Sequence, residues 1–306
     1  MSAGLQMIFW TGKLTFPIRL LINVNNLLSF LMGRMKDKTA MKERVKAGYE
    51  GEFSDHVKQY DERTSYYQRR SAVAQLEGLG FKGKEVVDIG CGTGIIAFLA
   101  LQAGARKVVC GDISAMMLGM GKESATALGY GSEKIQFHQF DAGALPFADN
   151  SFDIVVTGNA FGLFPDQEKA VREMYRVLRP GGTVSLGAHG PQHYWEAIDA
   201  TIRALTKRYV LGYRFEFWPR SEDQIYRLLQ RSGFENIRTS RFIWRNLFKE
   251  PEDACDFFAS VSSNWWDGKT PVDKREKEYN KTRDYFVKRG IRTISDDIIV
   301  ACGIKP

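Results

Sequence analysis

The sequence predicts an α/β fold built around a mostly parallel sheet, and two observations carry this prediction. Short apolar runs with strand character, such as Glu85–Ile89 and Ile154–Thr157, alternate with helical stretches through the middle of the chain. Glycine and proline stand where these elements end. Strands that alternate with helices imply right-handed crossovers, a parallel sheet and a ligand site at the carboxyl ends of the strands.

Composition limits the class of protein. The chain has 306 residues, of which 44% are hydrophobic and 26% charged. These values are typical of a globular protein and argue against a disordered, collagenous or disulfide-scaffold protein. The four cysteines lie far apart without metal-ligand spacing. We therefore expect a reduced, intracellular chain without a structural zinc.

The positive charge is concentrated at the N-terminus. The chain carries 43 Lys and Arg against 36 Asp and Glu, a net charge of +7, and residues 1–50 hold eight of these basic residues with only three acidic ones. The remaining 256 residues are close to neutral. This distribution argues against nucleic-acid binding by the body of the protein.

The segment Leu14–Met35 is apolar but interrupted by polar residues, so it does not read as a membrane-spanning helix. Arg19, Asn23 and Asn26 have the spacing of a polar stripe on a helix, and Leu and Val residues form the opposite face. Its charges follow the apolar run, unlike those of a signal peptide. Two interpretations remain open. The helix packs on the protein's own core or caps its active site, or it lies in a membrane interface beside the basic run Arg34–Lys46.

The body of the chain begins with a strand, a glycine-rich turn and a helix. Glu85–Ile89 reads as the strand, Gly90-Cys91-Gly92-Thr93-Gly94 as the turn and Ile95–Gln102 as the helix. Glycines let the backbone approach a ligand where a Cβ would clash, and the helix N-terminus offers N–H groups to an anionic part of the ligand. The next strand, Val108–Asp112, ends in an acid that can bind ribose hydroxyls.

This pattern also fits a dinucleotide-binding turn, because Gly92, Gly94 and Ala97 match that fingerprint. A nicotinamide enzyme is therefore an alternative. Against it, Asp88 directly precedes the glycines, where a carboxylate could pair with an ammonium group but would repel a pyrophosphate. Further along, a helix through Arg172–Leu178 ends at Arg179-Pro180-Gly181-Gly182 and leads into the strand Thr183–Gly187.

Four motifs in order over about residues 80–190 resemble those of the class I S-adenosylmethionine (SAM)-dependent methyltransferases. Within that superfamily the chain looks most like the ubiquinone/menaquinone-biosynthesis C-methyltransferase group. The supporting strings are Asp112-Ile113-Ser114 with Met117-Leu118 and Gly121-Lys122, Leu145-Pro146-Phe147, Phe161-Gly162-Leu163, and Glu173-Met174-Tyr175-Arg176-Val177-Leu178-Arg179-Pro180-Gly181-Gly182. The resemblance implies a Rossmann-like class I methyltransferase sheet whose last strand is antiparallel, with SAM as cofactor.

The resemblance also implies roles for individual residues. Gly90, Cys91, Gly92 and Gly94 would line the methionine portion of SAM, with Asp88 at its amino end. Asp112 would bind the ribose hydroxyls, and Ile113 and Met117 would pack on adenine, although core packing explains these two equally well. Asp141 would accept a hydrogen bond from the adenine amino group with Ala142 beside it, and Asn159 would face the sulfonium side.

The candidate catalytic residues are His189 and His193, in a loop after the fifth strand. Methyl transfer rests largely on positioning, but an acceptor with an acidic proton also needs a base. A histidine in a loop is more often a surface or hydrogen-bonding residue, so both interpretations stay open. No third ligand at suitable spacing accompanies the two, and we expect no metal site.

The C-terminal half is expected to begin with a helix over 194–209 and a second helix capped by Ser221. Strands near Ile237–Trp244 and Asp297–Cys302 follow, with a helical insertion between them. Residues 194–286 contain 19 of the chain's 38 Phe, Trp and Tyr. These aromatics fit either a packed core or an apolar acceptor pocket roofed by the insertion.

We therefore predict a basic amphipathic segment over residues 1–50 and a methyltransferase domain over 51–306, with the SAM-binding core at about 80–190 and the acceptor-binding insertion at about 194–290. The leading hypothesis is methyl transfer to a lipophilic acceptor, quinone-like or lipid, at a membrane surface. The protein would then be cytoplasmic and peripheral on the membrane, without a nucleic-acid partner. The alternatives are methylation of a soluble natural product or amine, with the N-terminal helix as a lid, and a non-catalytic SAM-binding or RNA-associated protein.

Overall fold

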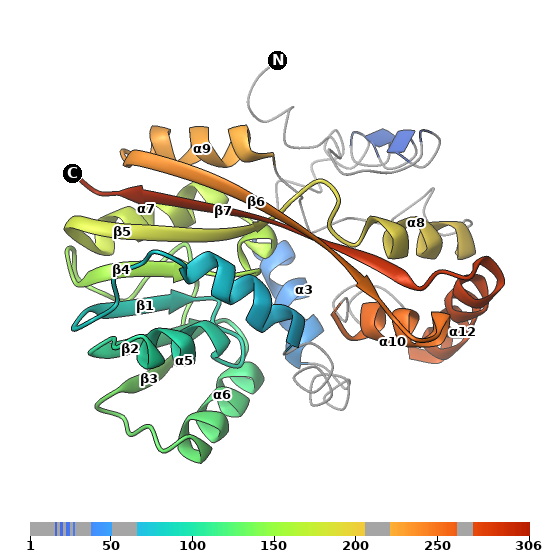
Figure 1. Ribbon diagram of the computed structural model, residues 1–306, viewed down its shortest axis with the longest axis horizontal. Coiled ribbons are helices and arrows are strands. Elements are labelled where there is room, and N and C mark those ends of the chain that lie inside the picture. Colours follow the sequence, from blue (N-terminus) through green and yellow to red (C-terminus); the bar gives the residue numbers. More distant parts are fainter. Residues whose placement is uncertain are drawn as a thin grey trace. The chain divides into compact units, whose positions relative to one another are not determined.

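The structure, a computed structural model (Figure 1), describes residues 38–50, 66–205, 221–261 and 272–306, together with residues 16, 19, 20, 23, 24 and 27. Most of the predicted amphipathic segment Leu14–Met35 and the start of the basic run Arg34–Lys46 lie outside the described residues. The chain divides into two compact units, which we describe one at a time. The sheet unit comprises Thr64–His189, Ser221–Arg241 and Ile298–Pro306, and the helical unit comprises Met1–Arg63, Gly190–Arg220 and Phe242–Asp297.

A seven-stranded sheet organises the protein, in the order β3-β2-β1-β4-β5-β7-β6 (Figure 1). Its strands are β1 (Glu85–Ile89), β2 (Lys107–Asp112), β3 (Ile135–Gln139), β4 (Phe152–Thr157), β5 (Leu178–His189), β6 (Glu235–Leu247) and β7 (Thr293–Ile304). The first five pair in parallel with their neighbours, whereas β7 is antiparallel to β5. The predicted Rossmann-like α/β sheet with an antiparallel last strand is confirmed.

Helices cover both faces of the sheet because the strands are apolar on both sides. On β1, Val87 and Ile89 belong to a core with α7 (Gln167–Val177) and α9 (Glu222–Arg231). The intervening Val86 belongs to a second core with α5 (Ile95–Gln102) and α6 (Ala115–Ala127). The alternation of side chains along a strand therefore separates the two cores.

The order of the strands locates the crevice in which this architecture binds ligands. The chain leaves the sheet edge at β3 and returns as β4 beside β1, so the crossovers diverge between β1 and β4. Ligands of open α/β sheets lie at this switch point, outside the carboxyl ends of the strands. The segments that follow β1, β2, β3 and β4 are therefore the candidates for the site.

The predicted element bounds hold best where the pattern is local. The predicted strand Glu85–Ile89 and helix Ile95–Gln102 agree with β1 and α5 residue for residue. Ser221 caps α9 as predicted, in a capping box with Gln224. The predicted turn Arg179–Gly182 lies within β5, which begins at Leu178 directly after α7; Gly181 has a left-handed φ of 76°, and regular pairing with β4 resumes at Thr183, where the strand was predicted to start.

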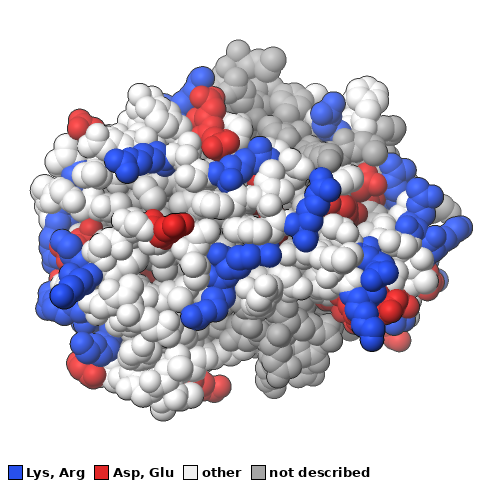
Figure 2. All heavy atoms as spheres, viewed as in Figure 1, with Lys and Arg blue, Asp and Glu red and all other residues white. Residues whose placement is uncertain are grey.

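The helical unit contains α3 (Lys38–Glu50), α8 (Trp195–Ala204), α10 (Pro251–Val261) and α12 (Val272–Arg289), with the adjoining parts of β6 and β7. Helix α12 packs against α10 and α8, and Phe257, Phe258 and Phe286 are fully buried. These three aromatics fill a core. Trp265 and Trp266, which belong to the same aromatic-rich region, lie outside the described residues. Lys and Arg side chains gather around α12, with some acidic ones among them (Figure 2). In the described part of the chain, no helix is both long enough and apolar enough to cross a membrane.

Candidate cofactor site

The glycine turn after β1 lies at the crevice and is held by the neighbouring strand. The backbone N–H groups of Gly90 and Cys91 both donate to the carbonyl oxygen of Gly111, at 2.7 and 3.0 Å. Gly94 ends the turn as the N-cap of α5, with a φ of 95° and no side chain capping the helix. No side chain therefore occupies this helix start, and its predicted role in binding a ligand stays a prediction.

Two glycines of this turn are needed for different reasons. Gly90 packs tightly, because a Cβ at this position would lie 2.5 Å from the Cβ of Ala160 in the loop after β4. Gly92 has a φ of 54°, yet a Cβ there would meet nothing within 4 Å. Space therefore lies open beside the backbone of Gly92. Cys91 is buried, and burial raises the pKa of its thiol well above the ordinary range, so Cys91 can serve this site through its backbone.

Asp88 is the most unusual ionisable group of the turn. Its side chain is 1% exposed, and neither carboxylate oxygen has a hydrogen-bond partner among the described residues. Burial, and secondly the charge of Asp112, raise the pKa of Asp88 to about 8; the backbone N–H of Ala97, in the first turn of α5, acts weakly in the opposite direction without reaching hydrogen-bond geometry. Burying a carboxyl group without hydrogen-bond partners costs roughly several kcal/mol of folding free energy, unless a donor or a cation reaches it. Together with the open space at Gly92, it fits the ammonium group of the methionine portion of SAM.

Asp112, at the end of β2, joins the glycine turn to α6. One carboxylate oxygen accepts from the backbone N–H of Gly92 at 3.0 Å, and the other accepts from the N–H of Ser114 at 2.9 Å. Ser114 in turn caps α6 by accepting from the N–H of Met117 at 3.2 Å. The start of α6 thus brings together Asp112, the predicted ribose ligand, and the predicted adenine contacts Ile113 and Met117. Met117 is buried and Ile113 is half-buried.

The loop after β3 carries the predicted adenine ligand Asp141. One oxygen of this carboxylate accepts from the N–H of Gly143 at 2.8 Å, and Asp141 forms a bridge with Ala144. Asp141 and Ala142 are half-buried. A tight turn thus fixes the direction of the loop's backbone beside the crevice.

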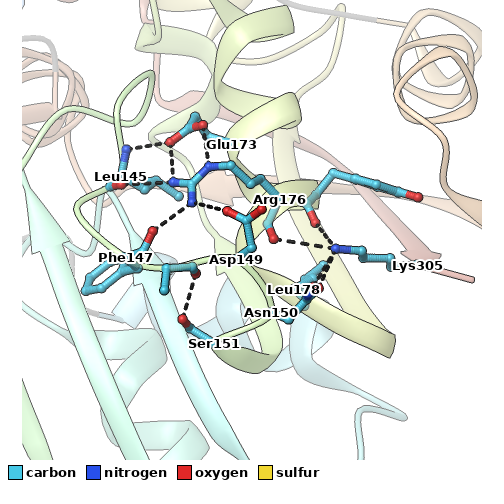
Figure 3. A network of polar contacts seen from close by, with 11 residues as sticks. Leu145, Phe147, Asp149, Asn150, Ser151, Glu173, Arg176, Leu178 and Lys305 are labelled. Carbon is cyan, nitrogen blue, oxygen red and sulfur yellow. Dashed lines mark hydrogen bonds and ion pairs between the residues drawn. The ribbon is translucent and has the colours of Figure 1, made fainter.

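Arg176 on α7 holds the rest of this loop from outside (Figure 3). Its guanidinium donates to the carbonyl oxygens of Leu145 and Phe147 at 3.0 and 2.7 Å, and to the carboxylates of Glu173 and Asp149 at 2.8 Å. Glu173 also accepts from the N–H of Leu145 at 2.8 Å. The hydrogen bonds from Arg176, as the main cause, lower the pKa of Glu173. Glu173 and Arg176 both stand in one of the motif strings, but their positions in the sequence do not reveal that they hold this loop.

Gln75 performs a similar task at the loop after β4. Its side-chain amide donates to the carbonyl oxygens of Thr157 and Ser185 at 2.9 and 3.1 Å. Gln75 is 3% exposed and lies on a helix that precedes β1. It joins β4 to β5 just before Asn159, which is half-buried. Asn159 therefore follows a strand end that is held in place from the side.

The two candidate catalytic histidines belong to different units. His189 ends β5 in the sheet unit, pairs with Ile298 in the ladder and is 6% exposed. His193, in the helical unit, is 3% exposed, and its Nδ1 lies 3.2 Å from a carboxylate oxygen of Asp296 and 3.3 Å from the backbone nitrogen of Asp297. When Nδ1 carries the proton and donates it to Asp296, Nε2 is left to accept a proton, whereas an Nδ1 that accepts from the N–H of Asp297 puts the proton on Nε2. The roles of both histidines remain predictions. No group of three or more His, Cys, Asp and Glu side chains in the described ranges could hold a metal ion.

Comparisons with known proteins agree with this geometry. Residues 87–186 match the family model described as a methyltransferase domain. A ubiquinone/menaquinone biosynthesis C-methyltransferase of Hahella chejuensis is 49% identical over 104 residues, which are 33% of this chain and 41% of that protein. The protein of the same description from Escherichia coli is 30% identical over 181 residues, which are 51% of this chain and 68% of that one. The chain thus spans less than half the length of the first relative.

Solved structures share the fold at low identity. The YcgJ protein of Bacillus subtilis has a TM-score of 0.53 and 23% identity, and the match covers 77% of this chain and 98% of that one. A phosphoethanolamine N-methyltransferase of Haemonchus contortus, solved with phosphomonomethylethanolamine and S-adenosylhomocysteine, has a TM-score of 0.52 and 16% identity, covering 82% of this chain and 57% of that one. At these identities the likeness concerns the fold.

Proposed function

Because the chain belongs to the class I SAM-dependent methyltransferases, we propose that it transfers a methyl group from SAM to a lipophilic small-molecule acceptor, quinone-like or lipid, at a membrane surface. The observation that carries the SAM part of the proposal is Asp88. A buried carboxyl without a partner, beside a turn with open space at Gly92, is suited to a ligand that brings an ammonium group.

The chain's own residues would hold the cofactor in three places. The turn Gly90–Gly94 and Asp88 receive the amino acid part, and Asp112 receives the ribose hydroxyls through the oxygens that already bind Gly92 and Ser114. The loop at Asp141 and Ala142, with Ile113 and Met117, receives the adenine. Asn159 would face the reacting end. When bound, SAM supplies an electrophilic methyl group on a sulfonium.

The protein's contribution to the reaction is then mainly positioning. An in-line displacement requires the acceptor atom, the methyl carbon and the sulfur to lie on one line. The enzyme must also exclude competing water. For an acceptor that must lose a proton, His193 is the proposed base, because Asp296 orients its ring. His189 is the second candidate. Residues 51–306 form the proposed catalytic domain.

The choice of a lipophilic acceptor rests on the chain's chemistry and on its relatives. The two relatives named above are described as ubiquinone/menaquinone biosynthesis C-methyltransferases. Three described apolar residues of the N-terminal segment, Phe16, Leu20 and Val24, are 68%, 53% and 48% exposed. Apolar side chains that remain in water are typical of a surface that meets lipid or another partner.

Calorimetric titration with SAM and with S-adenosylhomocysteine tests the cofactor part of the proposal. The unaltered chain should bind both, Asp112→Ala should abolish binding, and Asp223→Asn, an exposed residue of α9, should leave it unchanged. Absence of binding to the unaltered chain contradicts the proposal. For the acceptor, mass spectrometry of lipid extracts from cells with and without the gene should reveal a species that differs by one methyl group, and identical extracts argue against a lipid acceptor.

A further inference from the structure

The helical unit carries a distinct corner where β6 ends and β7 begins. The backbone N–H of Phe248 donates to the carbonyl oxygen of Arg292 at 2.8 Å, and Nε of Arg292 donates to the carbonyl oxygen of Phe248 at 3.2 Å. Helix α12 ends at Arg289, and its last turn closes through the N–H of Gly290 on the carbonyl oxygen of Val287 at 3.1 Å. Two strand ends and a helix end therefore meet at this corner.

The pleat of β6 turns apolar side chains outward at this corner. Beyond Arg241 the even-numbered residues are the covered ones, and Asn246 is 5% exposed while the rings of Phe242 and Trp244 stack at 5.6 Å. The odd-numbered residues point the other way, so Ile243 is 44% and Leu247 72% exposed. Among the described strands β6 lies at the edge of the sheet. Leu247 is the most exposed of the large apolar residues described.

Cationic side chains surround these apolar residues. Arg245, Lys249 and Arg292 are exposed, and none of the three forms an ion pair with another residue of the described ranges. The last turn of α12 adds Lys288 and Arg289. One acidic residue, the exposed Glu250, directly follows Lys249, and Glu252 and Asp253 stand in the first turn of α10. Figure 2 shows Lys and Arg side chains around α12, with acidic side chains among them.

We infer that the corner formed by Ile243, Arg245, Leu247, Lys249 and Arg292 docks the protein onto an anionic lipid surface. Leucine and isoleucine would enter the acyl boundary while the cations pair with lipid phosphates. A second copy of the chain would bring like charges together at this corner, and a nucleic acid would make no use of the exposed Leu247. The inference deepens the proposed function, from which it takes the membrane as partner, and it adds a docking surface distinct from residues 14–46.

Sedimentation of the full chain with vesicles tests the inference. The vesicles are phosphatidylcholine alone or phosphatidylcholine mixed with phosphatidylglycerol. The unaltered chain should partition onto the anionic vesicles, more weakly at high salt. Each of Arg245→Gln and Lys249→Gln should lower the partition coefficient about fivefold, and Leu247→Ser severalfold, while Arg245→Lys should retain binding.

Matched controls come from the sheet unit. Leu128, 55% exposed, and Arg227, in a surface ion pair with Asp223, give the variants Leu128→Ser and Arg227→Gln, which should bind vesicles like the unaltered chain. S-adenosylhomocysteine binding, measured on every variant, should be unchanged, so that loss of the cofactor site is distinguished from loss of docking.

Three results would overturn the inference. In the first, the corner variants bind anionic vesicles as well as the unaltered chain, whatever the effect of Leu20→Ser. In the second, the unaltered chain binds neither kind of vesicle. In the third, size-exclusion chromatography detects a dimer that Leu247→Ser dissociates, which would identify the corner as an interface between copies.

Discussion

Replacing Asp88 with asparagine should stabilise the empty protein and weaken cofactor binding. An acid whose pKa is higher in the folded than in the unfolded state binds its proton more tightly when folded. The free energy of unfolding therefore falls as the pH rises from the unfolded pKa to the folded one. For Asp88 these values are 3.8 and about 8. Asparagine has nearly the same shape and does not titrate, so this loss of stability is absent from the variant.

The magnitude follows from the two pKa values. Each pH unit between them costs about 1.4 kcal/mol of stability, which amounts to roughly 4 kcal/mol at pH 7. The buried amide of asparagine costs roughly 1–3 kcal/mol because it also lacks partners. We therefore expect a net gain of about 1–3 kcal/mol at pH 7. The difference between the two proteins should shrink by about 1.4 kcal/mol per unit as the pH falls towards 5.

Chemical denaturation of the empty protein between pH 5 and 8 measures this difference. Calorimetric titration with S-adenosylhomocysteine over pH 6 to 7 gives the second half of the test. If binding needs the ionised carboxylate of Asp88, the affinity of the unaltered chain should increase by up to about tenfold for each unit by which the pH rises. This pH dependence should be absent from Asp88→Asn. A stability difference that does not change with pH, or equal affinities for the two proteins, would refute the reasoning.

Three further substitutions test other parts of the site. Gly92→Ala should cost about 1 kcal/mol of stability. The control Gly129→Ala should cost the same, because Gly129 also has a left-handed backbone and open space around it. Only Gly92→Ala should lower the affinity for SAM, tenfold or more, in calorimetry. Arg176→Ala should cost roughly 2–3 kcal/mol in denaturation and raise the KM for SAM with kcat little changed, because it releases the loop of Asp141; an unchanged KM would contradict this. His193→Gln should lower kcat about 100-fold while S-adenosylhomocysteine binds normally, and an unaltered kcat would exclude His193 as the base.

The part of the site that local patterns describe could be predicted from the sequence. The strand β1, the glycine turn and α5 form one continuous segment whose conformation depends on residues within a few positions of one another. Asp88 and Asp112 could be placed because each ends a strand of that pattern. Neighbouring parallel strands end at the same edge of a sheet, so the two carboxylates were expected at one crevice.

The contacts that hold the loops of the site could not be predicted in this way. Gln75 reaches carbonyl groups 82 and 110 residues away, and Arg176 reaches back 31 residues to Leu145. His193 finds its carboxylate on β7, more than 100 positions later. Such partners depend on which strands become neighbours, and the spacing of residues along the chain carries no record of that. The predicted turn at Arg179–Gly182 is an irregularity within β5, where Gly181 has a φ of 76° and pairing with β4 passes from Leu178 to Thr183; only the pairing of Leu178 ahead of the turn could not be foreseen.

A crystal structure of the full chain with S-adenosylhomocysteine tests the central claim most directly. We expect the ligand's amino group against the carboxylate of Asp88, its ribose hydroxyls on Asp112 and its adenine beside Asp141. Density for the ligand elsewhere in the protein, or with its amino group turned away from Asp88, would contradict it.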